Sequence, residues 1–216
     1  MSNKEFDKIW DEIYERGDSC NKYPFDSIVS TLFRLLPKLH SSEPRLLEIG
    51  CGAGNNLLFA ANEGFKVYGL DASKYAIDFA NEFFTKNSKQ GNLQVGSFTE
   101  IPFEDSFFDV VIERAALSQV PCEIAKKAID QVHRVLKKDG YFYSEIYSDK
   151  SKVPRKKSKN GDTFIPKGPF AGVGQIFFYD EVRHNQLLKD FTFIEKNHVE
   201  RDFIVGDWKG YSECYW

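Results

Sequence analysis

The chain has 216 residues, of which 42% are hydrophobic and 15% are aromatic. This is enough apolar material for one sizeable core, which argues against both a disordered chain and a small disulfide scaffold. The formal net charge is -3, from 29 basic and 32 acidic residues. Broad nucleic-acid binding needs a dense basic surface, so this balance argues against it.

The sequence also lacks targeting and metal-binding patterns. No apolar run approaches the ~18 residues that a membrane-spanning helix needs. The start, Met1–Asp7, carries acids and lacks the apolar centre of a signal peptide. The four cysteines are widely separated and show no metal-ligand spacing: Cys20, Cys51, Cys122 and Cys214. We therefore expect a reduced, cytoplasmic protein with free thiols and without a metal or membrane partner.

Two helices are predicted before the first strand. Apolar residues recur at helical spacing over residues 4–16 and 26–36, and Pro37 ends the second helix. The apolar run 45–49 then predicts a buried strand, which leads directly into a glycine cluster.

From the glycine cluster onward, helices and strands alternate. Ser73 can cap one helix, and Pro121 suits the first turn of another, where a missing N–H costs nothing. The predicted helices cover 54–63, 73–86 and 121–137, and the predicted strands cover 66–70, 92–96, 108–112 and 141–147. Such alternation predicts a doubly wound, mostly parallel sheet with helices on both faces.

The alternation stops after residue 147. Residues 148–175 are rich in Lys, Gly, Pro and Ser and predict a long loop. Asp180 can cap a last helix to about residue 189, and strands near 191–200 and 211–216 would complete a seven-stranded sheet. The final strand looks cut off at its edge, which fits a natural chain that continues beyond Trp216.

We expect one domain over residues 1–216. Its predicted parts are an N-terminal helical cap (1–40), a cofactor-binding core (45–147), a lid loop (148–178) and a C-terminal helix with strands (179–216).

The segment 48–55 is the clearest candidate for a binding site. Its glycines lie where the first strand turns into a helix, so the backbone can turn tightly and approach a ligand closely. Asp71 follows 21 positions after Gly50, at the end of the second strand, where a carboxylate can accept both hydroxyls of a ribose. We expect the amides of residues 50–54 and the Asp71 carboxylate to bind the nucleoside part of a cofactor together.

The glycine pattern differs from that of a dinucleotide site. The third glycine of that fingerprint would stand where this chain has Asn55. The sequence also lacks a Tyr-x-x-x-Lys pair, its nearest match being Tyr179 with Arg183. An NAD-type oxidoreductase is therefore the weaker alternative.

Several ordered segments resemble one family. They are the glycine segment 48–54, Gly69–Ser73, Gly96–Phe103 with Phe107–Val111, and His133–Tyr141. Together they resemble the motifs of class I S-adenosylmethionine-dependent methyltransferases over roughly residues 45–147. The resemblance implies a Rossmann-like fold, S-adenosylmethionine as cofactor and S-adenosylhomocysteine as product.

The resemblance also implies roles for residues of the glycine segment. Gly50 and Gly52 would face the cofactor, with Cys51 and Asn55 in the same loop. Glu48 would help to orient the methionine amine through water.

Further roles follow at the ends of the later strands. Asp71 would hold the ribose diol, and Ala72 would lie beside the adenine. Ser97 stands where many relatives have an Asp that accepts from the adenine amino group, which leaves that contact to the Ser97 hydroxyl or the Phe98 N–H. Glu113 would lie near the methionine part.

Residues on the acceptor side are less clearly marked. Tyr14 and Tyr23 belong to the N-terminal segment, which in similar enzymes covers the open side of the cofactor. Arg114 and Tyr147 follow the fourth and fifth predicted strands and are further candidates for substrate contacts. No catalytic base is assigned.

Two segments after the core have two interpretations each. The run 150–159 holds six basic residues and is either a solvated stretch or a clamp for a phosphate-bearing acceptor, such as a nucleotide-linked sugar. The segment 164–174 is either a lid or a packed surface loop.

The isolated cysteine and the histidines favour structural roles. Pro121 and Cys122 open a helix eight residues after the fourth strand, which does not suit a cysteine nucleophile that attacks a base. The histidines are weak candidates for a base because of their places: His40 near a loop, His133 in the helix before the fifth strand, His184 on an expected surface helix and His198 in a late strand.

The sequence as a whole predicts methyl transfer to a small-molecule acceptor. A hydroxyl is the favoured acceptor group, with a sugar or glycan precursor as the more specific hypothesis. The alternative from another class is a non-catalytic, S-adenosylmethionine-binding regulatory protein that acts through a partner.

Overall fold

The computed structural model describes residues 8–157, 163–168, 170–207 and 209–216. They form two compact units, which are treated separately below. The sheet unit comprises Trp10–Glu113 and Asp130–Tyr143, and the second unit comprises Arg114–Ile129, Ser144–Trp216 and the described start of the chain up to Ile9. That residues 1–216 form one domain, with the parts expected above, remains a prediction. Within the described ranges, no helix combines the length and the apolar character needed to cross a membrane.

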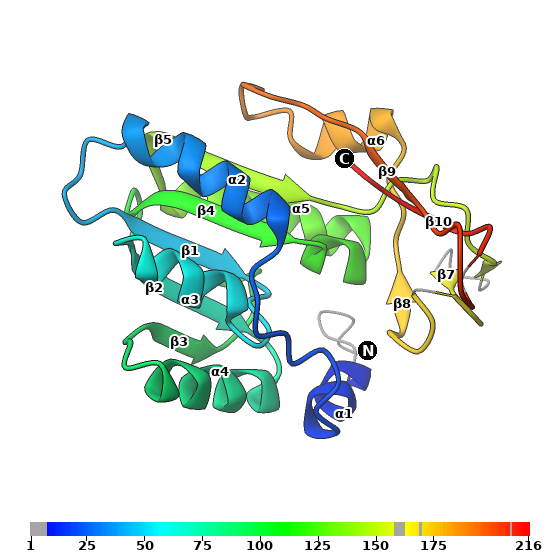
Figure 1. Cartoon of the computed structure of the whole chain (residues 1–216). Coiled ribbons are helices and arrows are strands. Elements are labelled where there is room, and N and C mark those ends of the chain that lie inside the picture. The colour runs from blue at the N-terminus through cyan, green and yellow to red at the C-terminus, as the bar shows by residue number, and fades with distance from the viewer. Residues whose placement is uncertain (1–7, 158–162, 169, 208) are drawn as a thin grey trace. The chain divides into compact units, whose positions relative to one another are not determined.

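A five-stranded sheet forms the centre of the sheet unit (Figure 1). Its order is β3-β2-β1-β4-β5, with bounds β1 Arg45–Ile49, β2 Lys66–Asp71, β3 Asn92–Val95, β4 Phe108–Arg114 and β5 Leu136–Glu145. β1 pairs in parallel with β2 and β4, and β2 pairs in parallel with β3. Parallel pairing brings the carboxyl ends of these strands to one edge, where ligands bind in open α/β sheets.

Helices flank this sheet as the apolar spacing predicts. They are α2 Asp26–Leu35 with the short η1 Leu36–Lys38, α3 Asn55–Asn62, α4 Lys74–Lys86 and α5 Cys122–Val135. The first helix, α1 Ile9–Glu15, contacts the start of α4 instead. These bounds confirm the helices expected over 26–36, 54–63 and 73–86. Of the helix expected over 4–16, residues 4–7 lie outside the described part of the chain.

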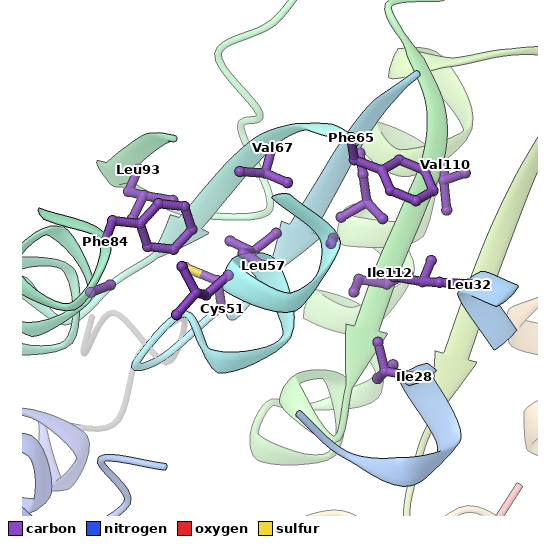
Figure 2. Packing of buried hydrophobic residues seen from close by; sticks show 14 of the residues in the cluster. Ile28, Leu32, Cys51, Leu57, Phe65, Val67, Phe84, Leu93, Val110 and Ile112 are labelled. Atoms are coloured by element: carbon purple, nitrogen blue, oxygen red, sulfur yellow. The ribbon is translucent and has the colours of Figure 1, made fainter. Parts of the chain in front are cut away.

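The core explains why β1 and β4 lie centrally. Leu46, Val110 and Ile112 pack with apolar residues of α2, α3 and α4 (Figure 2). The alternate residues Leu47 and Val111 point to the opposite face and are also fully buried. Strands that are buried on both faces are typical of a parallel sheet covered by helices.

The boundary between α5 and β5 differs from the prediction. The helix was expected to reach residue 137, but it ends at Val135, and β5 begins at once with Leu136. The N–H of Phe107 donates to the Val135 carbonyl (2.8 Å), and the N–H of Ser106 donates to the Arg134 carbonyl (3.0 Å). These bonds from the preceding loop satisfy carbonyls at the helix end, which a sequence pattern does not reveal.

Among its described residues, the stretch 148–175 in the second unit is not wholly the irregular loop that its composition predicted. It contains the short strands β6 Lys156–Lys157, β7 Thr163–Phe164 and β8 Gln175–Ile176, which pair antiparallel. Strands of two residues carry no alternation that a sequence can show.

The C-terminal part contains α6 Glu181–Leu187, which Asp180 caps by accepting from the N–H of Arg183 (2.8 Å). The strands β9 Val199–Asp202 and β10 Ser212–Tyr215 form a separate antiparallel sheet. The expected seven-stranded sheet is therefore not confirmed. Residues 212–216 do bond to the segment after β5, but Cys214 N–H donates to the Ser151 hydroxyl (2.9 Å), which interrupts a regular ladder.

The expected surface position of His184 is wrong. His184 is only 3% exposed. Its ring packs against the rings of Trp216 and Phe193, with 5.8 Å between ring centroids in each pair.

Candidate active site

The glycine segment adopts a conformation that favours glycine at three positions. Gly50, Gly52 and Gly54 have φ angles of +66°, +50° and +74°. Residues with a Cβ rarely adopt this left-handed region. Gly54 also immediately precedes α3. The three glycines thus allow the chain to turn tightly between the end of β1 and the start of α3.

Most amides of this loop bond within the protein. The N–H groups of Gly50 and Cys51 donate to the carbonyl of Leu70 (2.7 and 3.2 Å), and that of Gly54 donates to the Cys51 carbonyl (3.0 Å). The N–H of Gly52 donates to the Asp71 carboxylate (2.8 Å). Contact between loop and ligand would therefore depend on the bare Cα surfaces of the glycines more than on these amides.

Asp71 lies at the end of β2, next to the glycine loop. Its carboxylate accepts from the N–H of Gly52 through Oδ2 (2.8 Å) and from the N–H of Ser73 through Oδ1 (2.9 Å). Burial raises the pKa of this carboxyl above its ordinary value, the backbone donors oppose the rise, and the charge of Asp11 adds to it. The carboxylate is thus fixed in place and keeps acceptor capacity for a ligand, because two oxygens offer about four acceptor sites.

Tyr14 of α1 reaches this loop, while its role in binding remains a prediction. A Cβ built on Gly52 would lie 2.3 Å from the Tyr14 hydroxyl oxygen, so the hydroxyl sits directly over that glycine. Burial, followed by the negative charge of Asp71, raises the pKa of Tyr14 well above its ordinary value. The phenol therefore stays protonated at neutral pH and keeps an O–H that can donate to a ligand at the loop.

Two side-chain contacts join α1 to α4. The hydroxyl of Ser73, which caps α4, donates to Asp11 (2.7 Å), and the hydroxyl of Tyr75 donates to Glu15 (2.9 Å). Because Ser73 also donates its N–H to Asp71, the N-terminal helix is connected to the candidate site through one residue.

A second polar network lies behind the glycine loop. The side-chain amide of Asn56 donates to Glu48 (2.7 Å), and its carbonyl oxygen accepts from the N–H of Phe25 (3.1 Å). Asn55 donates its side-chain amide to the Tyr23 carbonyl (2.8 Å). Glu48, Asn55 and Asn56 are each at most 5% exposed. The network therefore holds residues 23–25 against the start of α3.

The structure assigns different surroundings to two predicted site residues. The Cys51 side chain lies within the apolar cluster of the sheet unit, so its predicted cofactor contact rests on the main chain (Figure 2). Tyr23 contributes its carbonyl oxygen to the network, while the residue is 85% exposed.

The candidate adenine contacts follow β3. The Ser97 hydroxyl accepts from the N–H of Thr99 (3.1 Å) and shares a hydrogen bond with the Thr99 hydroxyl (2.7 Å). Phe98 lies between these residues, and Ala72 follows Asp71 on the neighbouring strand end. Ser97 is thus a neutral group held by a local turn, next to the strand that carries Asp71.

Glu113 is brought to the same sheet edge by register. It lies opposite Ile49 in the pairing of β4 with β1, directly before the glycine loop, and it is fully buried.

Arg114 and Tyr147 belong to the second unit. Arg114 forms an ion pair with Glu145 (3.1 Å), and its guanidinium lies 5.4 Å from the ring centre of Tyr215. Burial lowers the pKa of Arg114, but Tyr147, Glu145 and Tyr215 together raise this pKa by more than burial lowers it. The net pKa is therefore above the ordinary value, and the cation persists. Tyr147 is buried against Phe170, at 4.5 Å between ring centres. Their substrate contacts remain predictions.

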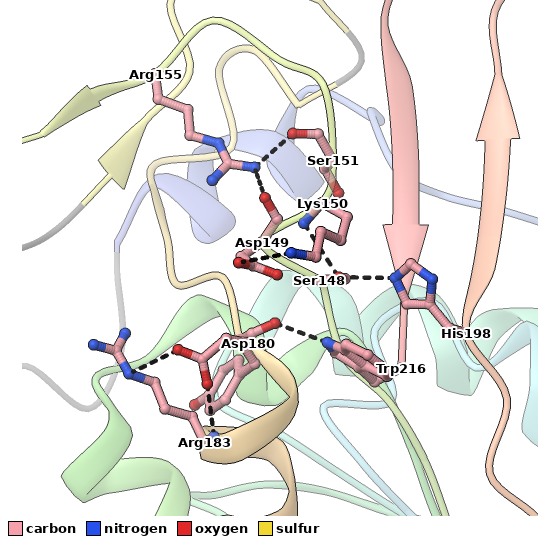
Figure 3. Close-up of polar contacts among 10 residues, drawn as sticks. Ser148, Asp149, Lys150, Ser151, Arg155, Asp180, Arg183, His198 and Trp216 are labelled. Carbon is pink, nitrogen blue, oxygen red and sulfur yellow. Dashed lines mark hydrogen bonds and ion pairs between the residues drawn. The ribbon is translucent and has the colours of Figure 1, made fainter.

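Part of the basic run 150–159 is bound within the protein. Arg155 donates to the carbonyls of Asp149 and Ser151 (3.0 and 2.6 Å), as Figure 3 shows. Lys152 forms an ion pair with Glu200 (2.8 Å). Residues 158 and 159 lie outside the described residues. These internal partners weaken the hypothesis of a phosphate clamp, because charges held in this way are less available to a ligand.

Sequence reasoning missed Asp11, Ser73 as a link to α1, and Asn56. Asp11 and Ser73 are 62 positions apart, and no local pattern predicts such a contact. Asn56 did carry a signal: two adjacent asparagines in the first turn of a buried helix require hydrogen-bond partners nearby.

Comparisons with known proteins agree with this geometry. Residues 47–144 match a family model described as a methyltransferase domain. An uncharacterized methyltransferase of Staphylococcus carnosus is 32% identical over 65% of this chain, and the uncharacterized methyltransferase YcgJ of Bacillus subtilis is 33% identical over 47%. The chain spans 65% and 40% of the lengths of these two relatives, less than two thirds of either.

A solved structure shows the same fold. An S-adenosylmethionine-dependent methyltransferase from Methanosarcina mazei superposes with a TM-score of 0.62 at 19% identity, covering 84% of this chain and 94% of that one. The matched domain begins within β1 and includes the glycine loop and Asp71. Residues 47–144 thus match a methyltransferase domain, and the likeness to the solved structure shows that this chain shares its fold.

Proposed function

We propose that this protein binds S-adenosylmethionine at the carboxyl ends of β1 and β2 and transfers its methyl group to a small-molecule hydroxyl. The observation that carries the proposal is the Asp71 carboxylate, held by the amides of Gly52 and Ser73 beside three glycines in left-handed conformations. This arrangement fits a ribose diol, because it presents a fixed acceptor next to a backbone without side chains.

The residues of the sheet unit suit the other parts of the cofactor. Glu48 and Glu113, both buried near the end of β1, provide negative charge for the methionine ammonium. Ser97 and Phe98 follow β3 and provide the adenine contacts, with Ala72 beside the ring. The Tyr14 hydroxyl covers the loop from α1.

When bound, the cofactor supplies a methyl group activated on a sulfonium. The protein would contribute mainly by orienting the acceptor in line with that bond, an effect worth up to ~7–11 kcal/mol. Arg114 and Tyr147 are the proposed acceptor contacts in the second unit. A hydroxylated sugar or glycan precursor remains the more specific proposal for the acceptor.

Two measurements test this function. Calorimetry with S-adenosylhomocysteine should show binding to the wild type and a loss of at least about tenfold in Asp71→Ala, since a charge-assisted hydrogen bond is removed. Transfer of a labelled methyl group should then occur to hydroxylated acceptors in a panel that also contains amines and carboxylic acids.

The outcomes separate the alternatives. Binding without turnover across the whole panel would favour a regulatory protein that uses the cofactor as a ligand. Absence of binding to the wild type, or unchanged affinity in Asp71→Ala, would contradict the proposed site. Tight binding of NAD instead would indicate an oxidoreductase.

A further inference from the structure

Asn56 occupies a place in the sheet unit that the family roles above do not explain. It lies in the first turn of α3, is 2% exposed and uses both ends of its side-chain amide. The amide nitrogen donates to Glu48 Oε1 (2.7 Å), and the amide oxygen accepts from the N–H of Phe25 (3.1 Å). One side chain thus connects a carboxylate of β1 with the backbone that precedes α2.

The direction of Glu48 depends on this contact. A carboxylate at the end of a strand can rotate about its side-chain torsions, and burial makes an ionised carboxylate costly unless it is hydrogen-bonded. The Asn56 amide fixes one oxygen of Glu48 on the α3 side. A carboxylate with about four acceptor sites keeps further capacity after accepting this bond.

We propose that Asn56 is a positioning residue for the cofactor: its amide fixes the Glu48 carboxylate for the methionine ammonium and connects that carboxylate to the backbone at residue 25. This inference rests on the proposed function, in which Glu48 recognises the ammonium. It adds that recognition of the amine depends on the N-terminal segment, which Asn55 also holds through the Tyr23 carbonyl.

The first test compares two ligands in one variant. S-adenosylhomocysteine carries the amino-acid part, whereas methylthioadenosine has the same nucleoside without it. Asn56→Ala should lower the affinity for S-adenosylhomocysteine about tenfold, which is the usual effect of losing a hydrogen bond to a charged group. The affinity for methylthioadenosine should change less than about twofold. The effect of Asn56→Ala should also largely disappear in a Glu48→Gln background.

The second test leaves the Asn56–Glu48 bond intact. Phe25 has a φ of -72°, which proline can adopt, so Phe25→Pro removes the N–H that donates to Asn56. Phe25→Ala is its matched control, because it loses the same ring and keeps the N–H. Phe25→Pro should bind S-adenosylhomocysteine several-fold more weakly than Phe25→Ala, while the two variants bind methylthioadenosine equally.

The outcomes decide the role of Asn56. Equal weakening of both ligands in Asn56→Ala would show a purely structural role and overturn the inference. Unchanged affinity for both ligands, or an undiminished effect in the Glu48→Gln background, would also overturn it while the proposed function stands. If the wild type binds neither ligand, the proposed function fails as well. Should Asn56→Ala not fold, the comparison of Phe25→Pro with Phe25→Ala decides.

Discussion

Gly52 is subject to two separate constraints. Its φ of +50° disfavours any residue with a Cβ, and such a Cβ would lie 2.3 Å from the Tyr14 hydroxyl. Gly64 has a φ of +95° with open space around the Cβ position, so it carries only the first constraint. We expect Gly64→Ala to lower the free energy of unfolding by ~1–2 kcal/mol, and Gly52→Ala to lower it clearly more. Urea denaturation measures both.

The double variant separates strain from collision. Removing the hydroxyl by Tyr14→Phe in the Gly52→Ala background should recover the excess loss and leave the conformational penalty, because the nearest remaining ring atom is 3.3 Å away. If Gly52→Ala and Gly64→Ala lower the free energy of unfolding by the same amount, the Tyr14 hydroxyl does not collide with a Cβ at position 52.

Asp71 should make cofactor binding depend on pH. Burial, the largest influence, raises its pKa above the ordinary value of 3.8, and protonation removes acceptor capacity for the ribose. Affinity for S-adenosylhomocysteine should therefore fall as the pH drops through the raised pKa. Calorimetry at several pH values measures this, and Asp71→Asn should bind weakly with a flatter profile.

The stability of the free protein should change in the opposite direction. Because the folded-state pKa of Asp71 is raised, its contribution to the free energy of unfolding is fully present below the ordinary pKa and is lost as pH rises through the raised value. An affinity for S-adenosylhomocysteine that does not fall at acidic pH would contradict the role of Asp71 in binding.

Single residues also show how far the sequence specifies the site. The strand–glycine–helix pattern and its spacing to Asp71 were recognisable because both lie in contiguous motifs. The partners of these groups were not. Tyr14 lies over Gly52, and Asn56 connects Glu48 with Phe25, through contacts that depend on how distant segments pack. The roles of these residues in binding remain predictions.

At the scale of elements, Ser73 connects two helices. Its hydroxyl accepts from the N–H of Ala76 at the start of α4 and donates to Asp11 of α1. Ser73→Ala should destabilise the protein by ~1 kcal/mol through the lost cap. Because the Asp11 contact is lost as well, backbone amides of α1 should exchange their hydrogens faster.

Asp180 provides the matched control. It caps α6 through the N–H of Arg183, and its loss in Asp180→Ala removes a cap without touching α1. Hydrogen exchange over residues 9–15 should therefore stay at the wild-type rate. Faster exchange of α1 in both variants would show that the effect reflects general destabilisation.

The elements themselves were largely predictable where apolar periodicity runs over several residues. The strands β1 to β4 and the helices α2, α3 and α4 agree with expectation to within about two residues. The predicted boundaries are wrong in two places. The helix α5 ends earlier than expected, where the N–H groups of residues 106 and 107 donate to its last carbonyls. The strands β6 to β8 were missed because they are too short to show a period.

At the scale of the whole molecule, cofactor binding and stability should be linked. A ligand that binds only the folded state raises the free energy of unfolding by ~2.7 kcal/mol at one hundred times its dissociation constant. S-adenosylhomocysteine should therefore raise the melting temperature progressively with concentration. Asp71→Ala should show almost no rise, and an equal rise in both proteins would place binding elsewhere.

The position of the Cys51 thiol has a further consequence under the proposed function, in which the protein binds an alkylating sulfonium. A thiolate in the glycine loop would be the strongest nucleophile near such a donor and a target for self-methylation. In this fold the Cys51 side chain points into the apolar core, and burial, followed by the charge of Asp71, raises the pKa of its thiol well above the ordinary value. If the proposed function holds, the orientation that fills the core should therefore also protect this thiol from the methyl donor.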